Sequence, residues 1–259
     1  MNFDTTKVVW FGCDKPPNTV YLPHLKFEWN PETFNLLGVE FTTNLHNITD
    51  ININRKLTEM NNELYQWSKR DLTPFGKITV IKTLIISKIV HILISLPTPS
   101  IKIINKINKL LYTFLWSNKP DQIKRNVTIL KPNDGGLGMV DLAIFYKSLK
   151  LTWLKRFLNC NAKWIVLIET IYPELKNVTN FGDAYIENLN KLIKNPFWEN
   201  VTRYYIEFYN KKQLESKDEV NEQGFLYNTN IKCRRVTGAE LNFYSIKSAQ
   251  PYEISNWEH

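Results

Sequence analysis

The residues of this chain best suited to chemistry are its lysines and arginines. Lys102, Lys106 and Lys109 stand four and three residues apart, so a helix would place all three on one face. Amino groups in such a row can neutralise the phosphates of a nucleic acid without reading its sequence. For any single lysine a solvated helix surface is the better explanation. The prediction of a phosphate-binding face therefore rests on the row as a whole.

Further basic residues occur where helix faces, helix ends and loops are expected. Lys77 and Lys88 lie on a narrow polar strip that also holds Ser87, His91 and Ser95. The predicted nucleic-acid-binding set is Arg70, Lys77, Lys82, Lys88, Lys102, Lys106, Lys109, Lys124 and Arg125.

The groups that an enzyme site would need are scattered. The four histidines have no metal-ligand spacing, the three cysteines form no CxxC pair, and no two of the nine aspartates are adjacent. The glycine-rich stretch 135–138 is not followed by the Lys-Ser/Thr of a phosphate loop, and a tight turn explains it better. His91 is expected to be a bundle histidine rather than a metal ligand. We therefore expect no catalytic residue, no metal and no cofactor.

The distribution of charge supports a polyanionic partner. The chain has 259 residues, 43% of them hydrophobic, and a net charge of +8, so it can bury a core and is not disordered overall. Residues 51–158 hold 18 Lys/Arg and 6 acidic residues, a net charge of +12, whereas residues 1–50 carry −3 and residues 159–259 carry −1. An excess confined to one segment favours a surface that faces nucleic acid.

The sequence favours an intracellular protein, nuclear or cytoplasmic. The N-terminus has no basic segment followed by an apolar one, so we expect no signal peptide and no secretion. The most apolar stretch, 78–96, is interrupted by Lys82, Lys88 and His91, and each charge at a bilayer centre costs roughly 3 kcal/mol. It is therefore expected to be a buried helix of a protein without membrane spans.

The first 48 residues have the period of strands. Leu25, Phe27 and Trp29 alternate with polar residues, and Leu37, Val39 and Phe41 do the same. Two short strands are not stable alone. We expect these apolar residues either to lie against the helices or to form an exposed patch.

From residue 51 the period becomes helical. A first helix to about residue 70 has a buried stripe of Ile53, Leu57, Met60, Leu64 and Trp67. A second, with Thr73 as N-cap and Pro74 in its first turn, continues to about residue 96. A third follows Ser100, which can cap it, with Ile104, Ile107, Leu111 and Phe114 buried.

The remainder is expected to be helical with loops. Asp141 can cap a helix, and 164–171, 185–193 and 197–208 have helical patterns, before a charged linker at 211–222. The predicted fold class is thus mainly α with a small β N-terminal part. Three regions are expected: strands in 1–48, a helical bundle in 49–131, and a helical C-terminal region in 132–259.

Several segments match sequence patterns of one known family, in the family's order. Residues 34–41 fit the pattern FxxLGVxF, and residues 67–88 fit WxxRxLTPxGKIxVIKTLxxSK closely. Further matching segments are 2–12, 96–99, 114–116, 120–125, 135–142, 148–153 and 225–231. Together they resemble the reverse transcriptases of non-LTR (long interspersed type) retrotransposons; the match runs from residue 1 to about 160 and then thins out.

The resemblance implies a part of a right-hand-shaped RNA-directed DNA polymerase. Residues 1–48 would be the edge of the palm, with Leu37, Gly38 and Val39 like the primer-grip strand. Residues 50–131 would be the thumb, which holds the template–primer duplex. The family's catalytic aspartates lie upstream of the segment that Asn2 begins, so we expect this chain not to polymerise DNA.

The expected function is therefore that of a polymerase fragment that binds template–primer nucleic acid, RNA template or RNA–DNA or DNA duplex, mainly through its phosphates. The alternative is a non-catalytic helical protein-interaction module whose lysines only keep the surface solvated. Both the charge distribution and the resemblance favour the first.

Overall fold

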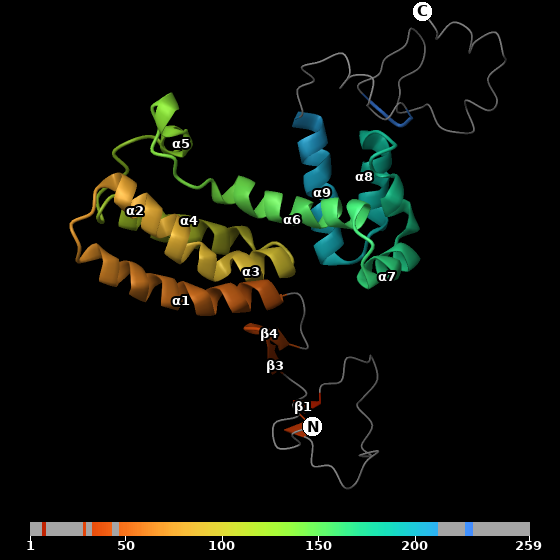
Figure 1. The fold of residues 1–259 in the computed structure, drawn as a ribbon, viewed down its shortest axis with the longest axis horizontal. Helices are drawn as coiled ribbons and strands as arrows, with labels where there is room; N and C mark the ends of the chain where they lie inside the picture. Colours follow the sequence, from red (N-terminus) through yellow and green to blue (C-terminus); the bar gives the residue numbers. More distant parts are fainter. Residues whose placement is uncertain (1–6, 9–27, 30–32, 43–46, 212–225, 230–259) are drawn as a thin grey trace, which may run out of the picture. The chain divides into compact units, whose positions relative to one another are not determined.

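The computed structural model describes residues 7–8, 28–29, 33–42, 47–211 and 226–229 (Figure 1). It confirms the predicted fold class, mainly α with a small β part near the N-terminus. The chain divides into two compact units, residues 1–143 and 144–259, with the division falling within one helix.

The first unit begins with short strands. β1 (Lys7–Val8) pairs in parallel with β2 (Glu28–Trp29), and β3 (Thr33–Leu36) forms an antiparallel hairpin with β4 (Val39–Thr42). The alternation through Leu37 predicted a strand there, and this is wrong. Leu37 and Gly38 form the hairpin turn, both with positive φ (52° and 80°), as a two-residue turn of type I′ requires. Leu25 and Phe27 lie outside the described residues.

The apolar residues of the hairpin are divided between the helices and solvent. Val39 is buried and β4 contacts the first helix, whereas Leu37 is 92% exposed at the turn. Phe34 and Phe41 stack on each other across the two strands, with ring centres 5.0 Å apart. Of the predicted apolar residues in the described hairpin, Leu37 at the tip is exposed, Phe41 is half-buried and Val39 is buried.

A helical bundle follows the hairpin. It comprises α1 (Ile48–Ser68), α2 (Pro74–Val80), a π-helical segment η3 (Ile81–Ile85), α3 (Ser87–Ser95) and α4 (Ile101–Leu115). Its core contains Ile53 and Met60 of α1, Ile85 of η3, and Ile107 and Leu111 of α4, each at most 1% exposed. The predicted α4 stripe is confirmed over its whole length, whereas in the α1 stripe Leu57 and Trp67 are only half-buried.

The second predicted helix starts as expected but is not continuous. The Thr73 hydroxyl accepts a hydrogen bond from the Gly76 N–H (3.3 Å), which confirms the N-cap. At η3 the Ile86 N–H donates to the Ile81 carbonyl five residues back, and the axis bends by 48°. Such a π-helical insertion is a recognised cause of kinks.

Among the described helices, none is by itself long and apolar enough to cross a bilayer. The bent pair 74–85 and 87–95 meets the length and composition criteria when its halves are taken together.

The first unit ends with α5 (Arg125–Ile129) and a 3₁₀ turn, η4 (Pro132–Asp134). The sequence placed a boundary at residue 131, but the following residues return to α5. The Met139 N–H bonds the Thr128 carbonyl, and the Gly138 N–H bonds the Leu130 carbonyl, each at 2.8 Å. The glycine-rich stretch is therefore a closed turn of the first unit.

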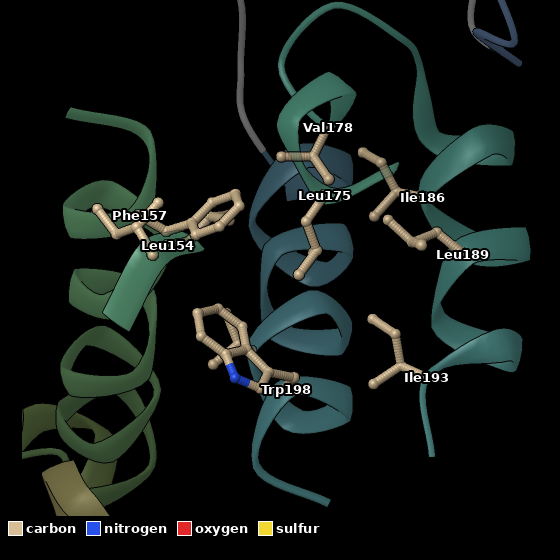
Figure 2. Close-up of a cluster of buried hydrophobic side chains, with 10 residues drawn as sticks. Leu154, Phe157, Leu175, Val178, Ile186, Leu189, Ile193 and Trp198 are labelled. Atoms are coloured by element: carbon tan, nitrogen blue, oxygen red, sulfur yellow. The ribbon is translucent and has the colours of Figure 1, made fainter. Parts of the chain in front are cut away.

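The second unit consists of α6 (Leu142–Asn159), α7 (Lys163–Ile171), η5 (Pro173–Asn177), α8 (Asp183–Leu192) and α9 (Pro196–Lys211). Asp141 caps α6 as predicted, accepting the Ala143 N–H at 2.8 Å. Figure 2 shows its core, in which side chains from α6, η5, α8 and α9 meet around Leu175. The part of the predicted linker beyond Lys211 lies outside the described residues.

A distant segment completes the second unit. Residues 226–229 dock on the start of α8, where the Gly182 N–H bonds the Leu226 carbonyl (2.8 Å). The Asp183 carboxylate accepts hydrogen bonds from both the N–H and the hydroxyl of Thr229. Asn228 is fully buried in this contact.

Candidate nucleic-acid interface

The row of lysines on α4 is exposed as the sequence predicts. Lys102, Lys106 and Lys109 are all exposed, opposite the side on which Ile103, Ile107 and Leu111 pack into the bundle. None of the three lysines forms an ion pair with a carboxylate in the part of the chain that the structure describes. Their ammonium groups are therefore available to an anion in solution.

The position of α4 is fixed at its N-terminus by α1. Ser100 precedes α4, and its N–H bonds the Asp50 carboxylate at 2.9 Å. One residue earlier on α1, the Thr49 hydroxyl donates to the Pro97 carbonyl at 3.0 Å. The first turn of α1 thus holds the connection that leads into the lysine row.

Other members of the predicted set are engaged within the protein. Lys88 pairs with Glu63 at 2.9 Å, and Arg125 pairs with Asp121 at 2.7 Å. The Lys77 ammonium donates to the Ser117 hydroxyl and, at 3.4 Å, to the Leu115 carbonyl, joining α2 to the end of α4. Each of these three cations therefore already has a partner within the protein.

The remaining members differ in their surroundings. The Arg70 guanidinium lies over the Trp67 ring, 4.2 Å from its centre, and Arg70 is exposed. Lys82 and Lys124 are exposed, Lys82 on η3 and Lys124 just before α5. Lys82 lies close to the glycine turn, since a Cβ added at Gly138 would lie 3.8 Å from its Nζ.

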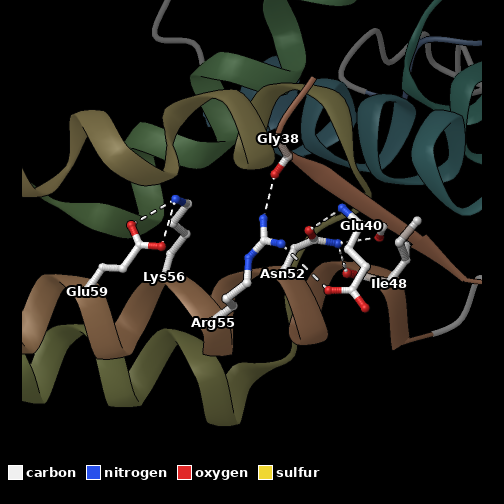
Figure 3. Close-up of polar contacts among 7 residues, drawn as sticks. All are labelled: Gly38, Glu40, Ile48, Asn52, Arg55, Lys56 and Glu59. Carbon is white, nitrogen blue, oxygen red and sulfur yellow. Dashed lines mark hydrogen bonds and ion pairs between the residues drawn. The ribbon is translucent and has the colours of Figure 1, made fainter. Parts of the chain in front are cut away.

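The hairpin is fastened to α1 by a buried amide, as Figure 3 shows. Asn52 is fully buried; its Oδ1 accepts the Glu40 N–H and its Nδ2 donates to the Glu40 carbonyl, both at 2.8 Å. Nδ2 also donates to the Ile48 carbonyl at 2.8 Å. The Arg55 guanidinium donates to the Gly38 carbonyl at 2.7 Å. The side chains of α1 therefore fix both β4 and the hairpin turn.

These contacts define where Leu37, Gly38 and Val39 lie. Val39 is packed inward, the Gly38 carbonyl is occupied by Arg55, and Leu37 projects into solvent from the turn. The three residues do not form a continuous strand edge. Of their side chains, that of Leu37 is exposed and that of Val39 is buried.

The flank of the bundle between α1 and α3 is electrically balanced. Arg55 pairs with Glu40 (3.7 Å), and Lys56 pairs with Glu59 (2.8 Å). A hydrogen bond from Lys56 lowers the pKa of the Glu59 carboxyl. Burial, and then the charges of Lys56 and Arg55, lowers the pKa of His91, which favours its neutral form. This flank is therefore a poor site for a polyanion.

Sequence reasoning missed Asn52, Arg55 and Lys56. Nothing in their spacing shows that an asparagine on a helix binds the backbone of a preceding strand. Among the described residues, no three His, Cys, Asp or Glu side chains come together in a way that could hold a metal ion. No model of a known protein family matches this chain.

Proposed function

We propose that this chain binds nucleic acid as a thumb-like fragment of a non-LTR retrotransposon reverse transcriptase. The observation that carries the proposal is the α4 row of Lys102, Lys106 and Lys109, which is exposed and free of carboxylate partners within the described residues. The ordered sequence resemblance gives it a family context. Such a fragment of a transposable element would act in the nucleus or the cytoplasm.

The contrast between two faces supports this assignment of the binding surface. The flank between α1 and α3 has cations of its own, but each has a carboxylate partner, so an approaching phosphate would have to break ion pairs there. The α4 row requires no such exchange. Phosphate contacts give affinity without sequence preference, so the ligand is proposed to be a template–primer duplex, RNA–DNA or DNA.

The binding test compares two variants of equal net charge. In the full chain, Lys102, Lys106 and Lys109 are replaced by Gln; the matched control replaces Lys155, Lys163 and Lys194, three exposed lysines of the second unit. Each variant lowers the net charge from +8 to +5. Fluorescence anisotropy with an RNA–DNA duplex should show much weaker binding for the α4 variant than for the control. Equal affinities would refute the proposed surface.

The proposal also says that the chain does not polymerise DNA by itself. The family's paired catalytic aspartates have no counterpart in this sequence, in which no two aspartates are adjacent. Primer-extension assays with the purified chain, Mg²⁺ and deoxynucleotides should yield no extended product. Template-dependent extension would contradict this part of the proposal.

A protein-interaction module is the second candidate, and one observation favours it. α7 carries an exposed apolar face made by Val166 (64% exposed), Leu167 (62%) and Ile171 (53%). Apolar side chains gathered in this way often mark protein contacts. Two results together would favour the protein-interaction module over the nucleic-acid-binding fragment. The two triple variants would bind the duplex with equal affinity, and replacing Val166 and Leu167 with Ser would abolish an interaction of the chain with another protein.

A further inference from the structure

The two edges of the β3–β4 hairpin differ in their hydrogen bonding. Asn35 of β3 lies opposite Glu40 of β4. The N–H and C=O of Glu40 point away from β3, because both bind the Asn52 side chain. In an antiparallel pair, opposite residues either bond each other or both point outward. The N–H and C=O of Asn35 therefore point outward too, from the other edge of the hairpin.

The outward backbone groups of Glu40 on the β4 edge have hydrogen-bond partners, whereas those of Asn35 on the β3 edge are available to a further strand. Asn52 occupies the β4 edge with both atoms of its carboxamide, so no further strand can be added at Glu40. On the β3 edge Asn35 is exposed, and its outward backbone groups have no partner within the part of the chain that the structure describes. The strand Thr33–Leu36 contains no charged residue and no proline, the usual devices that prevent strand addition.

We propose that β3 pairs antiparallel with β3 of a second copy of this chain, with Asn35 opposite Asn35. In this register the N–H of each Asn35 donates to the carbonyl of the other, so the open groups satisfy each other. With Asn35 opposite Asn35 in an antiparallel pair, Phe34 of one copy lies opposite Leu36 of the other. Both side chains are then on the same face of the joined sheet.

A second copy fits this edge because the pairing is self-complementary. The two-fold axis passes between the two Asn35 residues, and the same short strand supplies both halves. Leu36 is 54% exposed in the single chain and would be covered by Phe34 of the second copy. A two-stranded hairpin is marginal alone, and the pairing converts it into a four-stranded sheet. The interface is small, so the association is weak and reversible.

A disulfide test measures the register directly. Cys13, Cys160 and Cys233 are first replaced by Ser, and a cysteine is then introduced by Asn35→Cys or, as the matched control, by Leu37→Cys. Opposed hydrogen-bonded residues have Cα atoms about 5.5 Å apart, within disulfide range. The two Leu37 positions would be four residues apart along the strands, roughly 14 Å.

Mild oxidation should give a reducible covalent dimer with Asn35→Cys and little or none with Leu37→Cys. Absence of the dimer with Asn35→Cys, or equal yields from both variants, would overturn the proposal. Because Leu37 is the more exposed residue, random collision would favour the control instead.

Sedimentation equilibrium tests the pairing without a covalent link. Asn35→Pro removes the outward N–H and no hydrogen bond of the hairpin, and Leu36→Lys places a charge on the edge. Each should weaken dimerisation roughly tenfold or more, whereas Asn35→Thr, which keeps the N–H, should not. A wild-type chain that stays monomeric at every protein concentration measured by sedimentation would overturn the proposal.

The pairing does not depend on nucleic acid. The measurements use nuclease-treated protein in high salt, where phosphate contacts are weakened. The triple Gln variant of the α4 row should dimerise like the wild type. A failure of duplex binding and a failure of dimerisation are therefore separate results.

Discussion

Replacing Lys150 with Met should remove a strong pH dependence from the stability of the second unit. Lys150 lies on α6, is 1% exposed, and has its Nζ 4.3 Å from the ring centre of Phe197 on α9. Burial lowers the pKa of Lys150 from 10.5 to about 7. The cause is loss of hydration, which disfavours the charged form in the folded chain.

The sign follows from which state binds the proton. Above pH 10.5 the amine is neutral in both states, and below pH 7 it is charged in both. Between these values the unfolded chain holds a proton that the folded chain does not, so the free energy of unfolding falls as the pH falls towards 7. At about 1.4 kcal/mol per pH unit, the total is roughly 5 kcal/mol.

Denaturant unfolding of three chains measures this effect. Wild type, Lys150→Met and the control Lys155→Met, an exposed lysine of the same helix, are followed by tryptophan fluorescence at about pH 7, 8 and 9. The stability advantage of Lys150→Met over wild type should be largest at pH 7 and shrink by about 1.4 kcal/mol per pH unit. An advantage that does not change with pH would refute the reasoning, as would the same behaviour in Lys155→Met.

Three further substitutions test the contacts that shape each unit. Thr73→Ala should cost about 1 kcal/mol of unfolding free energy through loss of the α2 cap, measured by denaturant titration. Asn52→Ala should cost about 1–3 kcal/mol and speed hydrogen exchange of the Glu40 amide, which loses its partner. Gly182→Ala should displace residues 226–229, since the added Cβ would lie 2.4 Å from the Asn228 Cα; hydrogen exchange at the start of α8 should then accelerate.

Matched control substitutions are available for Thr73→Ala and Asn52→Ala. Ser100 precedes α4 as Thr73 precedes α2, but the expected cap is wrong there, because the Ser100 side chain makes no capping hydrogen bond. Ser100→Ala should therefore cost less unfolding free energy than Thr73→Ala. Asn54 is exposed on α1, and Asn54→Ala should leave the exchange of the Glu40 amide unchanged. Equal effects of test and control would contradict the assigned contacts.

The helices of the bundle could be predicted because the signals that define them lie within each helix segment of the sequence. The spacing of Ile53, Met60 and Leu64 defines a buried stripe, and Thr73-Pro74 defines a helix start, without reference to other elements. The exposure of the α4 lysines follows from the same periodicity. The hairpin turn was missed because Leu37-Gly38 lacks the Asn-Gly or Asp-Gly signal of such turns.

What could not be predicted depends on contacts between distant residues. Lys88 of α3 pairs with Glu63 of α1, and Asn52 binds the backbone of Glu40, twelve residues before it. The burial of Lys150 beneath an aromatic ring contradicts the usual exposure of lysine. Tertiary contacts therefore decide which of the predicted cations pair within the protein, whereas their number is evident from the sequence.

The most direct test of the central claim is a salt titration of duplex binding. Each phosphate contact contributes about 0.9 to the slope of log K against log salt, so loss of three contacts should make the slope shallower by about 2.7. We expect this change for the variant with Gln at Lys102, Lys106 and Lys109, and little change for the control at Lys155, Lys163 and Lys194, with the same thermal melting temperature for both. An unchanged slope in the α4 variant, with an unchanged melt, would contradict the proposed nucleic-acid interface.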